Sequence, residues 1–279
     1  MNEAPKSTNI KDVADAVKAI TENVPVYNDL VQPAANEIGK GLQTVAKLIH
    51  VALSPIQAVV WSYGQIEQYL TTTLEEKLKR VPKENIQTPD AHVVGPAIEA
   101  LRFTAKNEEL KRMYMNLIAN SMDSETANAA HPAFVDIIKN MNSDEAKLLK
   151  YLYENGTQAL VNFYYDNKDR SQRHLRLTNM TNMGIEDKLS SPNFSGIYIE
   201  NLKRLGLLEV PAGQSLFDES TYEQIFETEL FKKLVAEAQE DGNLVRPEKL
   251  SVNLTSFGDL FCYACISDKE NQEDQENTE

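Results

Sequence analysis

The sequence predicts a mainly α-helical protein, in which an N-terminal helical bundle with a central αα-hairpin precedes a smaller α+β, winged-helix-like C-terminal module. Two observations predict this fold class. Up to about residue 142, apolar residues recur every three or four positions, which is typical of helices that bury one face. After Ser143, two short alternating runs flank a polar loop, as they do in a β-hairpin.

These patterns divide the chain into four parts. We expect an N-terminal helix and linker over residues 1–25, an all-helical core over 26–142, the winged-helix-like α+β module over 143–266, and a disordered acidic tail over 267–279. The first boundary lies at Pro25, because the residue before a proline avoids helical backbone angles. The tail carries six acidic residues against one lysine, and a segment so charged has too little apolar surface to fold.

The central αα-hairpin is predicted over residues 39–80, with its turn at Ser54-Pro55. Serine can cap the second helix and proline suits its first position. The stretch from Leu48 to Ile66 carries no formal charge, and its length is near the roughly 20 residues that cross a membrane. Two interpretations therefore stay open: a buried hairpin in a soluble bundle, or a Leu42–Leu70 hairpin that inserts into a membrane. The candidate membrane or partner contacts are Leu48, Val51, Ile56, Val59, Val60, Trp61 and Tyr63.

Three further helices complete the predicted core. Gly95-Pro96 is predicted to start a helix whose inner side carries Ile98, Leu101 and Phe103. Asn107 is predicted to cap the next helix, since glutamates follow it and favour a helix N-terminus. The last of the three is predicted to begin near His131-Pro132.

The C-terminal module begins with a helix that we expect to stop at Gly156. The alternating runs 159–164 and 174–177 then predict a hairpin, followed by a helix over 194–205 and an extended segment over 207–210. One acidic amphipathic helix is predicted over 221–240, a strand over 250–254, and a final helix that ends near Ile266.

This order of helix, hairpin, helix and strand is similar to that of winged-helix modules, which can place a helix in the DNA major groove. The candidate nucleic-acid or anion contacts are Arg170, Arg173, Arg176, Lys203 and Arg204. The whole chain has a net charge of −14, and such a surface repels phosphate. We therefore expect these cations to lie on solvated surfaces and expect no nucleic-acid partner.

The sequence shows no catalytic constellation. Cys262 and Cys265 form a C-x-x-C pair without the second pair of ligands that a zinc site needs. The four histidines are scattered, and no phosphate-binding glycine loop occurs. We expect a non-enzymatic protein without a metal or cofactor. The start of the chain lacks a basic segment followed by an apolar run, so a cytoplasmic location is expected, with inner-membrane association if the hairpin inserts.

The order of several stretches resembles the Abi-alpha family of bacterial abortive-infection proteins. They include VALSPIQAVVWSY, GPAIEALRFTAKNEELKRMYMNLIANSMD, AHPAFVDIIKNMNSDEAKLLKYL and LTSFGDLFCYACI. The resemblance implies a helical core with a smaller mixed part and a role in defence against phage, and it brings no catalytic set. The positions that match the family's most recognisable motifs, with fold as their expected role, are Gly95, Pro96, Arg102, Asn120, Met122, His131 and Pro132.

Three hypotheses follow for the function. The first is a non-enzymatic phage-defence protein that acts by binding a phage or host protein. The second is a membrane-acting effector that inserts the Leu42–Leu70 hairpin. The third is a DNA-binding regulator that uses the winged-helix-like module.

Overall fold

The computed structural model of the chain describes residues 41–48, 63–104, 106–183 and 189–267. Residues 41–48 are helical. The helices that follow are α3 (Tyr63–Leu78), α4 (Ala91–Leu101), α5 (Glu108–Ser121), α6 (Ala133–Lys139) and α7 (Ser143–Asn155), with short 3₁₀ turns η1 (Lys83–Asn85) and η2 (Ala127–Ala129) between them.

The strands and the remaining helices occupy the C-terminal part. Their order is β1 (Gln158–Asp166), β2 (Arg173–Met180), η3 (Pro192–Phe194), α8 (Ser195–Arg204), β3 (Leu208–Glu209), α9 (Ser220–Phe226), α10 (Glu229–Glu240), β4 (Leu244–Leu254) and α11 (Ser256–Cys265). The protein is thus mainly helical with a small sheet in its C-terminal part, as the sequence predicts.

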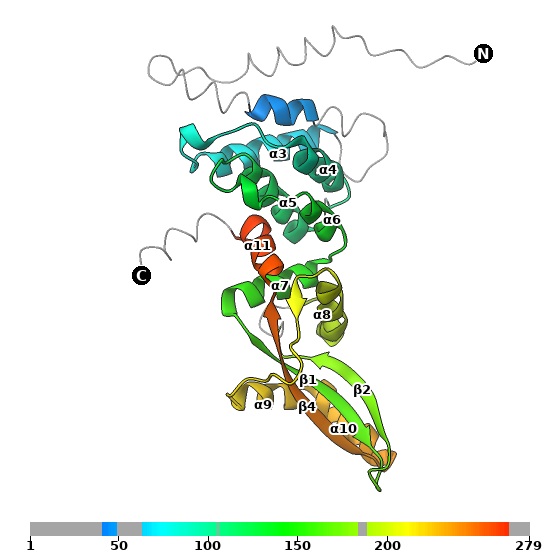
Figure 1. Cartoon of the computed structure of the whole chain (residues 1–279). Coiled ribbons are helices and arrows are strands. Elements are labelled where there is room, and N and C mark those ends of the chain that lie inside the picture. Colours follow the sequence, from blue (N-terminus) through cyan, green and yellow to red (C-terminus); the bar gives the residue numbers. More distant parts are fainter. Residues whose placement is uncertain (1–40, 49–62, 105, 184–188, 268–279) are drawn as a thin grey trace, which may run out of the picture.

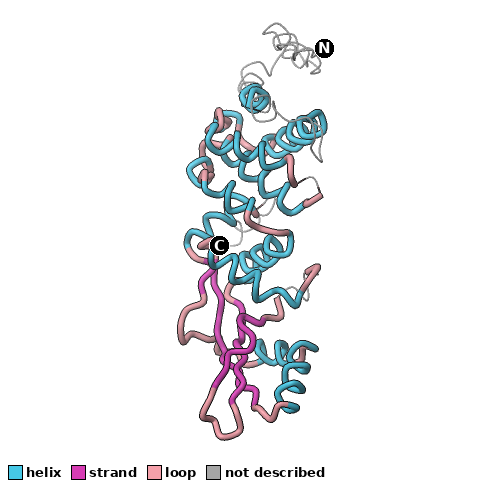
Figure 2. The backbone as a smooth tube through the Cα atoms, turned by 90° about the vertical axis from the view of Figure 1, so that its right-hand side faces the viewer, coloured by secondary structure: helices cyan, strands magenta, loops and turns pink. Residues whose placement is uncertain are grey.

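The molecule is elongated, with α3 to α6 at one end and the sheet with α9 and α10 at the other (Figure 1). Helices α7 and α11 lie between these ends (Figure 1). The tube view shows the same division into a helical half and a strand-rich half (Figure 2). Helix α11, the last helix among the described residues, therefore lies in the middle of the molecule.

The sheet has the strand order β2-β1-β4-β3, and all its pairings are antiparallel. The β1–β2 pair is the hairpin that the alternating runs predict. Strand β4 pairs with β1 along the whole length of β1, from Gln158 opposite Val252 to Asp166 opposite Leu244. Strand β3 pairs only with the end of β4, at Leu254 and Asn253. Most of the sheet is therefore the long three-stranded unit β2-β1-β4.

The main core joins the two halves. In α3 the apolar stripe of Ile66, Leu70, Leu74 and Leu78 is buried, which confirms the helical periodicity of the sequence. The same core contains Leu117 of α5, Leu149 of α7 and Phe261 of α11, and partly buried Leu42 and Leu48 pack against it. Burial of each large side chain stabilises the fold by about 1.5–3 kcal/mol, so α11 contributes directly to the stability of the helical part.

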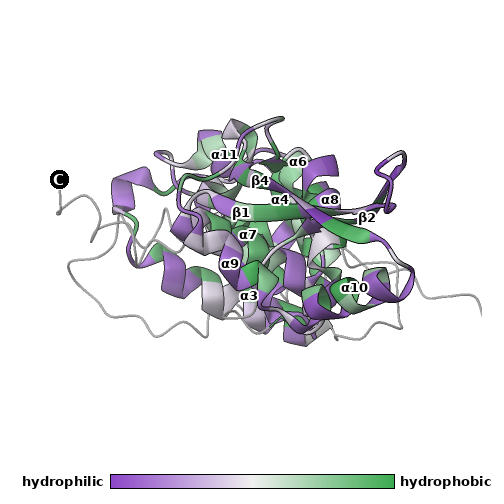
Figure 3. Cartoon of the chain, turned by 90° about the horizontal axis from the view of Figure 1, so that it is seen from below, coloured by the Kyte–Doolittle hydropathy of each residue, from purple (hydrophilic) through white to green (hydrophobic). Residues whose placement is uncertain are grey.

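A second, smaller core lies between the sheet and the helices α9 and α10. It contains Val161 and Phe163 of β1 together with Tyr222, Ile225 and Leu234 of the helices. Seen along the long axis, α9 and α10 lie on one side of β1 and β4, and α10 carries both hydrophobic and hydrophilic residues (Figure 3). Since successive side chains of a strand point to opposite faces, Asn162, Tyr164 and Asp166 lie on the other face.

Two predictions about α4 are wrong. The helix starts at Ala91, not at Gly95-Pro96, because the Asp90 carboxylate accepts a hydrogen bond from the His92 amide and caps it. Pro96 lies inside the helix. Gly95 suits the position before it, since a residue without Cβ avoids the clash with the proline ring. Phe103 is 70% exposed, because the helix ends at Leu101 and no longer directs this residue inward.

Two predictions about the C-terminal part are also corrected. The acidic helix predicted over 221–240 is two helices, because Thr228 interrupts it and caps α10 by accepting a hydrogen bond from the Phe231 amide. The strand predicted over 250–254 extends back to Leu244, since the polar residues before Leu250 pair with β1. Tertiary pairing here overrides the low strand propensity of these residues.

Most of the predicted membrane or partner hairpin lies outside the described residues, including Val51, Ile56, Val59, Val60 and Trp61. Tyr63 is the first residue of α3. Across the part of the chain that the structure describes, none of the helices combines the length and apolarity that crossing a membrane requires.

Candidate binding pocket

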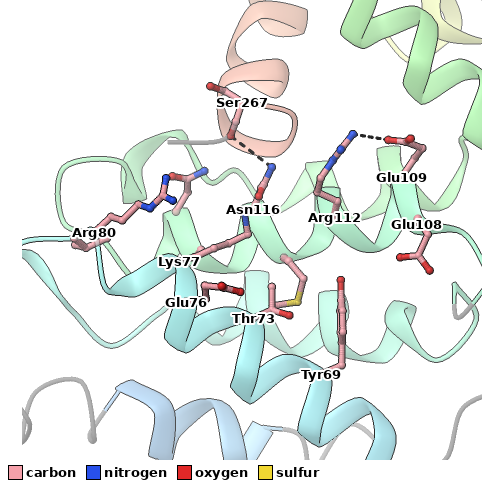
Figure 4. A pocket seen from close by; sticks show the side chains of 14 residues that line it. Tyr69, Thr73, Glu76, Lys77, Arg80, Glu108, Glu109, Arg112, Asn116 and Ser267 are labelled. Carbon is pink, nitrogen blue, oxygen red and sulfur yellow. Dashed lines mark hydrogen bonds and ion pairs between the residues drawn. The ribbon is translucent and has the colours of Figure 1, made fainter. Parts of the chain in front are cut away.

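A pocket of about 380 Å³ lies between α3 and α5, next to the end of α11 (Figure 4). Within each helix the lining residues recur every three or four positions, which places them on one face. The side chains from α3 and the turn after it are Tyr69, Thr73, Glu76, Lys77, Arg80 and Val81, and those from α5 are Glu108, Glu109, Arg112, Met115, Asn116, Ala119 and Asn120. Ser267, just after α11, completes the lining.

The pocket has two chemically different ends. Glu108 and Glu109 lie at one end, in the first turn of α5, where carboxylates are favoured by the helix dipole. Lys77 and Arg80 lie towards the other end, near Ser267 (Figure 4). Arg112 forms an ion pair with Glu109. The lining contains three cationic and three anionic side chains: Lys77, Arg80 and Arg112, and Glu76, Glu108 and Glu109. It is therefore neutral overall, although the whole chain has a net charge of −14.

Tyr69 forms part of the wall near Glu108. Burial raises the pKa of this phenol above 10.0, and the Glu108 carboxylate raises it further. The ammonium group of Lys111 lies 5.3 Å from the centre of the Tyr69 ring and 2.6 Å from a Glu108 carboxylate oxygen. The Tyr69 ring thus lies between a cation and a carboxylate in the wall of the pocket.

Two asparagines of α5 hold the end of α11 at the pocket. The Asn120 amide donates to the carbonyl oxygen of Ala264 over 2.9 Å, and the Asn116 amide donates to that of Cys265 over 3.0 Å. Asn116 also reaches the carbonyl oxygen of Ser267 (Figure 4). The last carbonyl groups of a helix lack intrahelical partners, so these contacts satisfy groups that would otherwise be buried without one.

The side chains that line the pocket are suited to binding a polar or charged ligand. It presents amide, hydroxyl, carboxylate and cationic groups, which can bind a charged peptide segment by hydrogen bonds and ion pairs. No cluster of three or more His, Cys, Asp or Glu side chains able to hold a metal ion occurs among the described residues. Burial raises the pKa values of the Cys262 and Cys265 thiols well above their ordinary value, so both cysteines are neutral core residues.

The predicted anion contacts are spread over two places. Arg173 and Arg176 lie on β2, where they pair with Asp166 and Glu237. Arg170 is exposed in the hairpin turn with φ 58°. On α8, Lys203 pairs with Glu200, and Arg204 donates to the Asn201 side-chain oxygen. The structure therefore does not bring the five cations into one site, and four of them have partners within the protein.

The residues that match the family motifs lie in the helical part. Gly95 and Pro96 belong to α4, Asn120 holds α11, and Met122 is the buried residue that caps α5. Arg102 is buried after α4 and stacks on the Phe103 ring. The His131 ring contacts the rings of Phe134 and Phe257, and Pro132 directly precedes α6. Of these positions, only Asn120 lines the pocket.

Sequence reasoning missed the joint between α7 and α8. Asp144 and Glu145 are both 4% exposed. Asp144 accepts hydrogen bonds from the amides of Ser190 and Ser191 and from the Tyr198 hydroxyl, and Glu145 accepts one from Asn201. A carboxylate in the first turn of a helix is ordinarily a solvated capping residue, so the sequence carried no signal that these two are buried.

Comparison with known proteins gives three results. The model of the Abi_alpha family, described as abortive infection alpha, matches residues 63–265. No curated protein matches the chain. One solved structure that matches is that of an uncharacterized protein from the hydrocarbon-degrading marine bacterium Alcanivorax borkumensis SK2, with 20% identity, coverage of 52% of this chain and 96% of that chain, and a TM-score of 0.33.

The family match includes α3 and α5, which supply most of the pocket lining, and it extends over most of the described helices and strands. On this match, the chain belongs to the abortive infection alpha family.

Proposed function

We propose that this protein is a non-enzymatic phage-defence protein of the abortive-infection type, and that it acts by binding a protein partner from the phage or the host. The observation that carries the proposal is the family match over residues 63–265. The pocket between α3 and α5 is the proposed contact site, because it gathers polar side chains of both charges in a cavity of about 380 Å³.

Such a pocket fits one segment of a partner rather than a whole interface. A stable protein interface buries about 1,600 Å² in total, so the surrounding surface would contribute as well. The polar lining supports recognition by ion pairs and hydrogen bonds, which give specificity more than affinity. We therefore expect that removal of the charged groups in the pocket lowers the specificity of partner binding and leaves the fold intact.

The experiment is a phage challenge of cells with and without the gene, at low and high multiplicity of infection. Protection at low multiplicity together with culture collapse at high multiplicity is the expected result. The double variant Lys77→Gln/Arg80→Gln removes two pocket cations, and Lys79→Gln is the matched control, because Lys79 is exposed and does not line the pocket. Full protection by the double variant would contradict the pocket assignment, and no protection by the native protein would contradict the function.

We also propose that the winged-helix-like part, from α7 through α8 to β4, contacts protein and not DNA. The pairing of Arg173, Arg176 and Lys203 with carboxylates supports this proposal. DNA binding requires cations that neutralise the phosphates and displace the counterions of the DNA, and these three cations are already neutralised by carboxylates of the protein. A duplex-binding titration in increasing salt tests it. Salt-dependent binding of duplex DNA by the native protein would favour the regulator hypothesis instead.

A further inference from the structure

The last described residue, Ser267, lines the pocket, and the chain continues from it into the acidic segment 268–279. We propose that this segment, the acidic tail, docks in the pocket of its own molecule and competes there with the acidic part of a partner. The inference deepens the proposed function and rests on it for the role of the partner. The docking itself rests on the geometry and the charges of the pocket.

The first argument is the point at which the tail starts. Asn116 donates hydrogen bonds to the carbonyl oxygens of Cys265, Ile266 and Ser267, over 3.0, 3.4 and 3.5 Å. These contacts hold the end of α11 against α5. The tail therefore follows directly after a residue that lines the pocket.

The second argument is charge. The tail carries six acidic residues and one lysine, a net charge of −5. The pocket end nearest Ser267 carries Lys77 and Arg80 together with Glu76 (Figure 4). Arg112, one helical turn from Asn116, pairs with Glu109. The glutamates of α5 lie at the far end, in its first turn. At the end nearest Ser267 the two cations, Lys77 and Arg80, outnumber the one carboxylate, Glu76, so this end favours an acidic segment.

The third argument is reach. Twelve residues follow Ser267, and an extended chain spans at most about 3.3–3.6 Å per residue, roughly 40 Å in all. The lining from Tyr69 to Arg80 follows a helix with a rise of 1.5 Å per residue, roughly 17 Å. The tail is long enough to follow the whole pocket. Its covalent attachment also provides an effective concentration in the millimolar range, so a weak electrostatic contact suffices.

The test uses the purified full chain with a nitroxide spin label on Gln275→Cys. The native Cys262 and Cys265 are fully buried, so they do not compete for the label. Amide resonances of Lys77 and Arg112 report on the pocket, and those of Lys168, in the distant hairpin turn, serve as the control. The reference is the same labelled protein with a neutral tail, in which every tail acid becomes its amide: Asp268→Asn, Glu270→Gln, Glu273→Gln, Asp274→Asn, Glu276→Gln and Glu279→Gln.

We expect the native tail to broaden the pocket resonances and to leave those of Lys168 unchanged. The broadening should be lost with the neutral tail, with Lys77→Gln/Arg80→Gln, and in 1 M salt, where the Debye length is about 3 Å. It should persist in Lys79→Gln. Equal broadening by the native and neutral tails, or none by either, would overturn the docking, because charge would then play no part.

The outcome of this test is distinguishable from that of the phage challenge. Absence of charge-dependent broadening, with protection still lost in Lys77→Gln/Arg80→Gln, overturns the tail docking and leaves the proposed function standing. Broadening with full protection by that variant supports the docking and contradicts the pocket as the partner site. If the docking and the pocket as the partner site both hold, the protein with the neutral tail should bind a synthetic peptide of residues 268–279, used as the acidic probe, more tightly than the native protein does.

Discussion

The side-chain amide of Asn116 on α5 lies 3.0 Å from the carbonyl oxygen of Cys265 on α11, although 149 positions separate the two residues in the sequence. With Asn120 one turn later, this contact joins the helical half of the molecule to its last helix. The same joint places Ser267, just after α11, in the lining of the pocket.

Asn116→Ala should destabilise the protein by about 1–3 kcal/mol, because it leaves buried carbonyl groups without donors. The free energy of unfolding in urea measures the effect. Asn128→Ala is the control, since Asn128 is exposed and belongs to the short turn η2. Equal stability of the two variants would show that solvent replaces the Asn116 contacts.

Asp144→Asn should destabilise the protein at pH 7 by about 1–2 kcal/mol, through weaker hydrogen bonds to the former carboxylate. Burial raises the pKa of Asp144, but hydrogen bonds from Ser190, Ser191 and Tyr198 outweigh it and lower the pKa below 3.8. A carboxyl group with a lowered pKa in the folded state stabilises the fold above its ordinary pKa, and that contribution is lost as the pH falls through the folded value.

The difference in unfolding free energy between the native protein and Asp144→Asn should therefore be constant above about pH 5 and shrink below it. Urea titrations between pH 3 and pH 7 measure this difference. Asp241→Asn, at an exposed position after α10, should show no such dependence. A difference that grows on acidification would contradict the assignment of the hydrogen bonds.

Asp166→Asn should make the sheet face that carries Asn162, Tyr164 and Asp166 bind polyanions. Asp166 pairs with Arg173 and Arg246, each over 2.8 Å, and these contacts hold its carboxyl pKa below 3.8, with the Arg173 bond as the largest cause. Without the carboxylate, both guanidinium groups become available to phosphate or sulfate. The variant should elute from heparin at higher salt than Asp241→Asn, which changes the net charge equally. Identical elution would show that the arginines find other partners.

Gly258→Ala should destabilise the protein by about 1–3 kcal/mol or more, because overpacking strains a closely packed contact. A Cβ at this position would overlap the carbonyl oxygen of Leu207, so α11 would have to move away from the chain that leads into β3. Ser256→Ala is the control on the same helix, at an exposed position. Thermal unfolding compares the two variants, and similar melting temperatures would contradict the close approach.

The parts of the fold that sequence reasoning predicted are the local ones. The burial of Ile66, Leu70 and Leu74 follows from their spacing, and the capping of α5 by Asn107 follows from the residues after it. The break at Thr228 was missed, although threonine is a good cap, because the apolar spacing continues through it. A periodic pattern reports which face is buried, and it does not report where a helix is interrupted.

The candidate site could not be predicted from the sequence, because it depends on contacts between distant segments. Tyr69 and Arg112 read as ordinary surface residues of separate helices, and only packing places them around one cavity. The extension of β4 to Leu244 was missed for the same reason, since its polar start forms a strand by pairing with β1. Pro247 is tolerated there because that part of β4 pairs with a strand on one side only.

The position of α11 in the middle of the molecule has a consequence for synthesis on the ribosome. Domains generally fold as their chains emerge, N-terminal residues first, yet the core around α5 includes Phe261 and Cys262. A nascent chain that stops before Ser256 lacks these residues and the carbonyl groups that Asn116 and Asn120 bind. Completion of the helical half must therefore wait until α11 has been synthesised, so a message interrupted before Ser256 yields a helical half that lacks part of its core.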